Sequence, residues 1–169
     1  MIKKILIGLA IVFIIIQFIH PDKNDSNDLT YDVSTKYEVP EAINDLLKVS
    51  CNDCHSNKTE YPWYANVQPV AWWLNDHVVD GKRHLNFSTF TKLPIAVQNH
   101  KFEETIEMVE DKEMPLDSYT NFGLHSEANL TDEQREMLMD WAKEQMTYLK
   151  TTYPADSLVM KRRSPPPTK

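Results

Sequence analysis

The pentapeptide Cys51-Asn52-Asp53-Cys54-His55 constrains this chain more than any other stretch. Its C-x-x-C-H pattern is the attachment signature of c-type haem. Two thiols must reach the two vinyl groups on one edge of a porphyrin, and an imidazole must reach the iron from one face. Positions i, i+3 and i+4 of a helix share a face. We therefore expect one covalent haem c, held by Cys51 and Cys54, with His55 as an iron ligand.

Two other uses of paired cysteines are open. A C-x-x-C pair can form a redox disulfide of the thioredoxin type, but the flanking sequence lacks a β-α-β pattern. A structural zinc site needs four ligands, and only distant histidines or carboxylates could complete it. The chain has 2 cysteines, so neither is spare for another bridge. Haem attachment is the favoured interpretation.

The fold class predicted is all-α, a cytochrome c-like helical domain around one covalently bound haem. Only 3 glycines and several long amphipathic stretches favour helices over a β sandwich. Apolar spacing predicts helices over residues 40–50, 69–81, 94–112 and 131–149. Pro40, Pro69 and Pro94 suit first turns, and Thr131 with Gln134 matches a capping box. We expect the last helix to pack on the 40–50 helix.

The first residues suggest a membrane anchor. A basic start is followed by residues 5–19, which are almost wholly apolar. This fits an export signal whose basic end stays in the cytoplasm. No small-x-small cleavage site follows, which favours an uncleaved signal-anchor over residues 1–20, although the run is shorter than the ~20 residues of a relaxed spanning helix. A cleaved signal is the alternative.

The rest of the chain divides into three parts. Residues 21–38 are polar and rich in turn formers, which predicts a flexible linker. Residues 39–153 form the haem-binding domain, and residues 154–169 form a disordered, basic, proline-rich tail. We expect the domain at the cytoplasmic membrane, facing the periplasm or exterior, because c-type haem is normally attached there.

Met114 is the predicted second iron ligand. It precedes Pro115 on an extended loop, from which a thioether can reach the face opposite His55. Methionine paired with histidine raises the reduction potential relative to two histidines. A gap-filling core methionine is the structural alternative. His77 is the alternative ligand, on the apolar stripe of the 69–81 helix, and His125 is a weaker one.

Three aromatic residues are predicted to contact the haem. Tyr61 and Trp63 follow the motif closely and can cover a haem edge, or they are ordinary core and loop aromatics. Trp73 shares the apolar stripe with His77. Arg83 or His84 could pair with haem propionates.

These residues together resemble the haem-binding-domain family of exported bacterial proteins, related to monohaem cytochromes c, over residues 38–150. The matching pieces are Cys-Asn-Asp-Cys-His-Ser-Asn at 51–57, Tyr-Pro-Trp-Tyr at 61–64, Pro69 with Trp72 and Trp73, Gly81 with Arg83, Leu85-Asn86-Phe87-Ser88, Met114-Pro115-Leu116 with Tyr119, and Leu130-Thr131 leading to Trp141. The resemblance implies a c-type haem on Cys51 and Cys54, with His55 proximal and Met114 distal. The segment 56–113 is longer than in the smallest cytochromes c.

The favoured function is one-electron transfer by an electron carrier, with no catalytic residue assigned. A haem-based module that binds or senses a small ligand is the first alternative. A peroxidase-type enzyme is the second, with His77 or His125 as its distal acid–base groups. A net charge of −7 argues against nucleic acid as a partner and suits a basic redox protein, whose identity the sequence does not give.

Overall fold

Residues 1–120 and 125–160 are described by the computed structural model, and every regular element within them is a helix. The all-helical part of the predicted fold class is confirmed. The α-helices are α1 (Ile2–Ile16), α2 (Glu41–Ser50), α3 (Asn52–His55), α4 (Val70–His84), α5 (Ile95–Glu110), α6 (Asp117–Thr120) and α7 (Asp132–Thr152). Short 3-10 helices are η1 (Val33–Thr35), η2 (Trp63–Asn66), η3 (Phe87–Lys92), η5 (Ser126–Ala128) and η6 (Ala155–Ser157).

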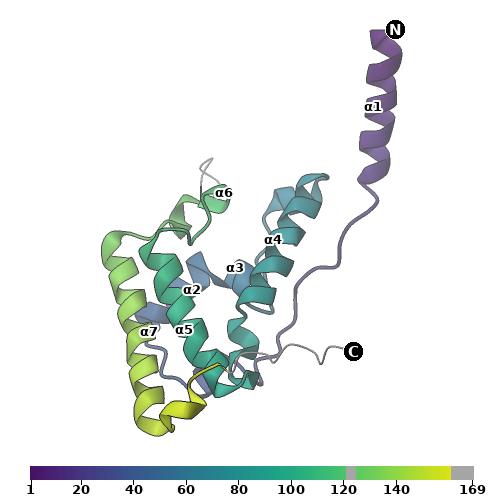
Figure 1. The fold of residues 1–169 in the computed structure, drawn as a ribbon. Coiled ribbons are helices and arrows are strands. Elements are labelled where there is room, and N and C mark those ends of the chain that lie inside the picture. Colours follow the sequence, from purple (N-terminus) through teal and green to yellow (C-terminus); the bar gives the residue numbers. More distant parts are fainter. Residues whose placement is uncertain (121–124, 161–169) are drawn as a thin grey trace, which may run out of the picture.

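The core lies between α5 and α7, which pack side by side in opposite directions (Figure 1). Phe102 of α5 meets Trp141 of α7 edge to face, with ring centroids 5.6 Å apart. Helix α2 also contacts α7, as predicted. The opposite wall is α4, and the short α3 lies between the two walls (Figure 1).

Helix α7 begins as the sequence predicts. The Thr131 hydroxyl accepts a hydrogen bond from the Gln134 amide, and the Gln134 side chain accepts one from the Thr131 amide. This capping box satisfies two amides of the first turn, which have no partner within the helix. The predicted end of α4 is wrong, because the helix continues through Gly81 to His84.

The prediction of an N-terminal membrane anchor is wrong. Helix α1 has 15 residues, which at 1.5 Å per residue is about 22 Å long. The hydrocarbon core of a bilayer is ~30 Å thick. Among residues 1–120 and 125–160, the structure contains no helix with the length and apolar character needed to cross a membrane.

Residues 21–38 do not form the flexible linker that the sequence predicts. Val33 and Tyr37 are only 3% and 2% exposed in the hydrophobic core. The Asn24 side chain donates to the Ser56 carbonyl and to the Thr59 hydroxyl. Buried apolar residues and hydrogen bonds therefore fix this segment, called the N-terminal strap below, against the domain.

The predicted tail is described only in part. Residues 155–157 form η6, and the neighbouring Leu158 packs against the core. The basic and proline-rich residues 161–169, predicted to be disordered, lie outside the described residues.

Candidate functional site

A cavity of about 630 Å³ lies between α3, α4, α5 and the loop before α6. This volume falls in the range of ~300–1,000 Å³ that is usual for cofactor sites. Six predicted site residues border this cavity, namely Cys51, Cys54, His55, Trp73, His77 and Met114. Aliphatic side chains supply much of the remaining wall, including Leu74, Leu85, Val109, Leu116 and Leu138. The fold thus brings residues from distant parts of the sequence to one apolar space.

The cysteine motif forms a single helical turn. The amides of Cys54 and His55 both donate to the Cys51 carbonyl, at 3.1 and 2.9 Å. This turn gives the predicted i, i+3, i+4 arrangement, and all three side chains border the cavity.

The thiols differ from those of a redox pair. Both are free of disulfide bonds. Burial raises the pKa of Cys51 to about 12 and that of Cys54 to about 11, whereas catalytic C-x-x-C motifs lower the pKa of the attacking thiol. The zinc alternative lacks a ligand set, because residues 1–120 and 125–160 hold no group of three or more His, Cys, Asp or Glu able to bind a metal ion.

The His55 ring is held by its backbone neighbours. Its Nδ1 lies 3.1 Å from the Gly81 carbonyl and 3.0 Å from the Leu85 carbonyl. Both partners are acceptors, so Nδ1 is the protonated donor and Nε2 keeps its lone pair for a metal. Burial also lowers the pKa of His55, which favours the neutral ring that metal binding requires.

Gly81 allows α4 to approach the motif closely. A Cβ atom at this position would lie 2.6 Å from the Cys54 carbonyl oxygen and 2.9 Å from Cys54 Cβ. Glycine is therefore needed for contact between two helices and does not mark a helix end. The same contact brings the Gly81 carbonyl within reach of His55.

Met114 and His77 border the cavity, whereas the weaker candidate His125 does not. The Met114 amide donates to the Met108 carbonyl at 3.0 Å, and Met108 also borders the cavity. The His77 Nδ1 donates to the Trp73 carbonyl at 2.8 Å, and the two rings pack 4.3 Å apart.

The comparisons with known proteins bear on this geometry. A family model described as a haem-binding domain matches residues 11–144. The chain belongs to this haem-binding domain family. No curated protein and no solved structure matches the chain. The match includes the N-terminal strap, in line with its packing against the core.

The cavity of this haem-binding domain fits a haem. It offers two thiols and one imidazole on the same short turn, an apolar wall, and a His55 Nε2 that has no hydrogen-bond partner among residues 1–120 and 125–160. His84 and Lys101 also border the cavity and could meet the propionates. Arg83 does not border the cavity; its guanidinium is exposed and pairs with Asp80 at 2.9 Å.

Two predicted haem contacts lie elsewhere in the haem-binding domain. The Tyr61 hydroxyl accepts a hydrogen bond from the Asn24 amide at 2.9 Å, and Trp63 is 77% exposed. Neither residue borders the cavity. Tyr61 contacts the N-terminal strap and Trp63 is open to solvent, so closeness to the motif in sequence does not bring these rings to the site.

Sequence reasoning gave little weight to Asp53 and Tyr119, which link the motif to residues 113–119, called the methionine loop below. The Tyr119 hydroxyl donates to Asp53 Oδ2 at 2.7 Å, and burial and this bond raise the pKa of Tyr119. The Tyr119 ring stacks on His125 at 4.3 Å, and the His125 Nε2 meets the Tyr64 hydroxyl. In the sequence, only the position of Tyr119 shortly after Met114 indicated that Tyr119 belongs near the site.

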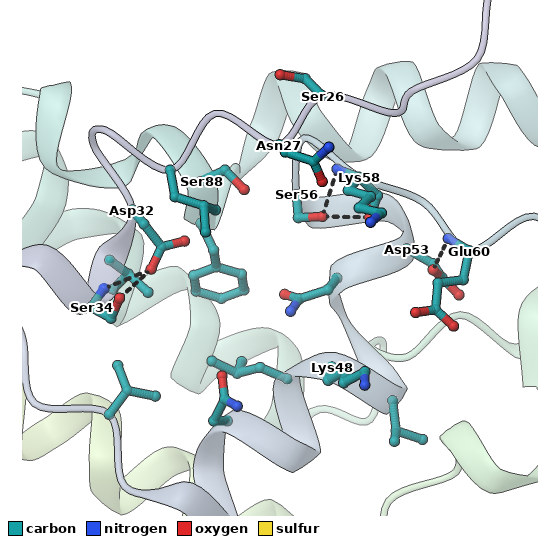
Figure 2. A pocket seen from close by; sticks show the side chains of 18 of the residues that line it. Ser26, Asn27, Asp32, Ser34, Lys48, Asp53, Ser56, Lys58, Glu60 and Ser88 are labelled. Carbon is teal, nitrogen blue, oxygen red and sulfur yellow. Dashed lines mark hydrogen bonds between the residues drawn. The ribbon is translucent and has the colours of Figure 1, made fainter.

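Asp53 and Tyr119 also border a second cavity. This space of about 590 Å³ is lined largely by polar side chains from the N-terminal strap, α2 and the motif. Figure 2 places Asp53 beside Glu60, whose amide donates to Asp53 Oδ1 at 2.8 Å. The two cavities therefore meet at the motif.

Proposed function

We propose that this chain is a monohaem c-type cytochrome-like protein that transfers single electrons. One observation supports this more than any other. Cys51, Cys54 and His55 border one apolar cavity, while two backbone carbonyls accept from the His55 Nδ1 and leave its Nε2 without a partner among the described residues. The haem, when bound, would supply an iron that cycles between the ferric and ferrous states. The protein would bind it, orient it and exclude water.

Met114 is the proposed second axial ligand. Its thioether belongs to a loop that borders the cavity, and its backbone is tied to α5 and α7 by hydrogen bonds. A fixed loop favours a ligand that stays in place through both oxidation states. Methionine would also raise the reduction potential relative to a second histidine. His77 is the alternative ligand.

We also infer that the domain works outside the cytoplasm, at the outer face of the cytoplasmic membrane, because c-type haem is normally attached on that side. Its redox partner would be a protein with a basic docking face, since the chain has a net charge of −7. The same charge disfavours nucleic acid as a partner.

Expression together with haem-attachment machinery tests this proposal. We expect the mass of the denatured protein to exceed that of the polypeptide by one haem, and Cys51→Ala with Cys54→Ala to abolish this gain. A colourless product with the mass of bare polypeptide would contradict the proposal.

Spectra then distinguish electron transfer from the other functions. A low-spin, six-coordinate ferrous form that does not bind carbon monoxide would support electron transfer. Rapid carbonylation of the wild type would support a ligand-binding or sensing module, and peroxide turnover above that of free haem would support an enzyme. Met114→Ala should remove the absorption signature of methionine ligation, whereas His77→Ala should leave it unchanged.

A further inference from the structure

The methionine loop, residues 113–119, includes the start of α6 and is held at both of its ends by side-chain hydrogen bonds to other parts of the chain. Met114, Pro115 and Leu116 lie between these ends and all border the larger cavity. The Met114 amide also donates to the Met108 carbonyl, and the two side-chain attachments add to this backbone bond in setting the position of the Met114 thioether.

The first attachment is made by Arg135, on the first turns of α7. Its Nη1 donates to the Met114 carbonyl at 2.7 Å and to the Val109 carbonyl at 3.0 Å. Val109 lies in the last turn of α5, where helix carbonyls lack partners within the helix. One guanidinium thus joins the end of α5, the start of the loop and α7.

The second attachment joins the end of the loop to the cysteine motif. Tyr119 donates from its hydroxyl to Asp53 Oδ2 at 2.7 Å. Asp53 lies between the two cysteines, and its other carboxylate oxygen accepts from the Glu60 amide at 2.8 Å (Figure 2). Both carboxylate oxygens are therefore engaged, so Asp53 offers a fixed and charged acceptor, which makes a stronger bond than a neutral one.

We propose that Tyr119 and Arg135 are positioning residues for the second axial ligand, holding Met114 over the haem that Cys51, Cys54 and His55 bind. This inference rests on the proposed function. When either bond is lost, the loop spends more time away from the iron, and the vacated position becomes open to a small exogenous ligand. Neither residue touches the iron.

The test uses the full chain with its haem attached and carbon monoxide as the probe ligand. Tyr119→Phe keeps the ring and removes the hydroxyl. The matched control is Tyr37→Phe, which loses a hydroxyl bonded to Gln98 in the core, away from the cavity. Arg135→Met is the second variant, with the exposed Arg83→Met as its control. Haem content and far-ultraviolet circular dichroism establish that each variant is folded.

We expect Tyr119→Phe and Arg135→Met each to accelerate carbon monoxide binding to the ferrous protein about tenfold, because one charge-assisted hydrogen bond no longer favours the closed loop. Both should weaken the ferric absorption band of sulfur ligation, and both controls should match the wild type. Asp53→Ala should resemble Tyr119→Phe, and the double variant should add little to either change, as expected for partners in one bond.

Two results would overturn the inference in distinguishable ways. If Met114→Ala keeps the sulfur band, the axial ligand assigned under the proposed function is wrong, and the positioning role falls with it. If Met114→Ala loses the band but Tyr119→Phe binds carbon monoxide no faster than Tyr37→Phe, Met114 remains the ligand and the positioning role is refuted.

Discussion

The two sides of the larger cavity are built differently. On the α3–α4 side, the backbone sets the geometry, because two carbonyls orient His55 and a glycine allows the two helices to be in contact. On the side of the methionine loop, side-chain bonds from Tyr119 and Arg135 add to one backbone bond, from the Met114 amide to the Met108 carbonyl. Substitution can delete a side-chain bond but cannot delete a carbonyl. The orientation of His55 should therefore tolerate most substitutions around it, whereas the position of Met114 should depend on individual side chains.

Gly81→Ala should cause the largest effect, because it disturbs the backbone-built side directly. The new Cβ would lie 2.6 Å from a carbonyl oxygen, which cannot move as a flexible side chain can. We expect a loss of about 1–3 kcal/mol in the free energy of unfolding, as for other overpacked sites, and a low yield of attached haem. Denaturant unfolding and haem content measure the two effects.

Gly8→Ala is the matched control, since nothing lies within 4 Å of a Cβ at that position. It should show no loss of stability or haem. Equal behaviour of the two variants would contradict the close contact at Gly81.

A smaller effect concerns the pH dependence of the haem-free protein. Burial lowers the pKa of His55 in the folded state, so below about pH 6.5 the unfolded state binds more protons than the folded state. The stability contributed by the neutral ring is present above that pH and is lost as the pH falls through the folded pKa. The free energy of unfolding should therefore decline on acidification from pH 7 to 5.

His55→Gln should make that decline shallower, whereas His20→Gln, at an exposed residue outside the cavity, should leave it unchanged. Denaturant titrations at several pH values provide the comparison. Identical slopes for the wild type and His55→Gln would show that burial does not affect this ring.

Thr131→Ala should reduce the stability of α7, the helix that carries Arg135. The loss should be smaller than that caused by Gly81→Ala. The capping box precedes Arg135 by one turn, and removing such a cap costs about 1 kcal/mol. We expect this loss in thermal or denaturant unfolding, with an unchanged haem spectrum. Thr147→Ala, at an exposed position within α7, serves as the control and should change stability by less than about 0.5 kcal/mol.

Trp63→Ala should have the smallest effect, because this residue is 77% exposed and borders neither side of the cavity. The haem spectrum should be unchanged. Trp73→Ala, which removes a ring from the cavity wall, should shift it. A spectral change in Trp63→Ala would show that Trp63 does affect the haem and would contradict its placement outside the cavity.

Local patterns predicted the helices and the shared face of Cys51, Cys54 and His55. Apolar periodicity gave the ends of α2, α5 and α7 to within three residues, because each helix buries one stripe. The C-x-x-C-H spacing was enough to predict that both thiols and His55 share a face, since all three belong to one helical turn.

Tertiary contacts decided what local patterns did not. Gly81 looked like a helix end, since glycine costs about 1 kcal/mol in a helix interior, and only the packing against Cys54 explains its place within α4. Tyr61 and Trp63 are near the motif in sequence but lie outside the cavity. The bond between Asp53 and Tyr119 joins residues 66 positions apart, for which no local pattern exists.

The strap also sets a practical boundary for shortened versions of the chain. A version that starts at residue 39, as the sequence-based division suggests, would lose Tyr37 from the core and the Glu38 carbonyl that accepts from the Trp141 indole at 2.8 Å. Such a version would expose apolar core side chains of α5 and α7 to solvent and would tend to aggregate. Samples trimmed for crystallisation or NMR should therefore retain Asn24 and everything that follows it up to the motif.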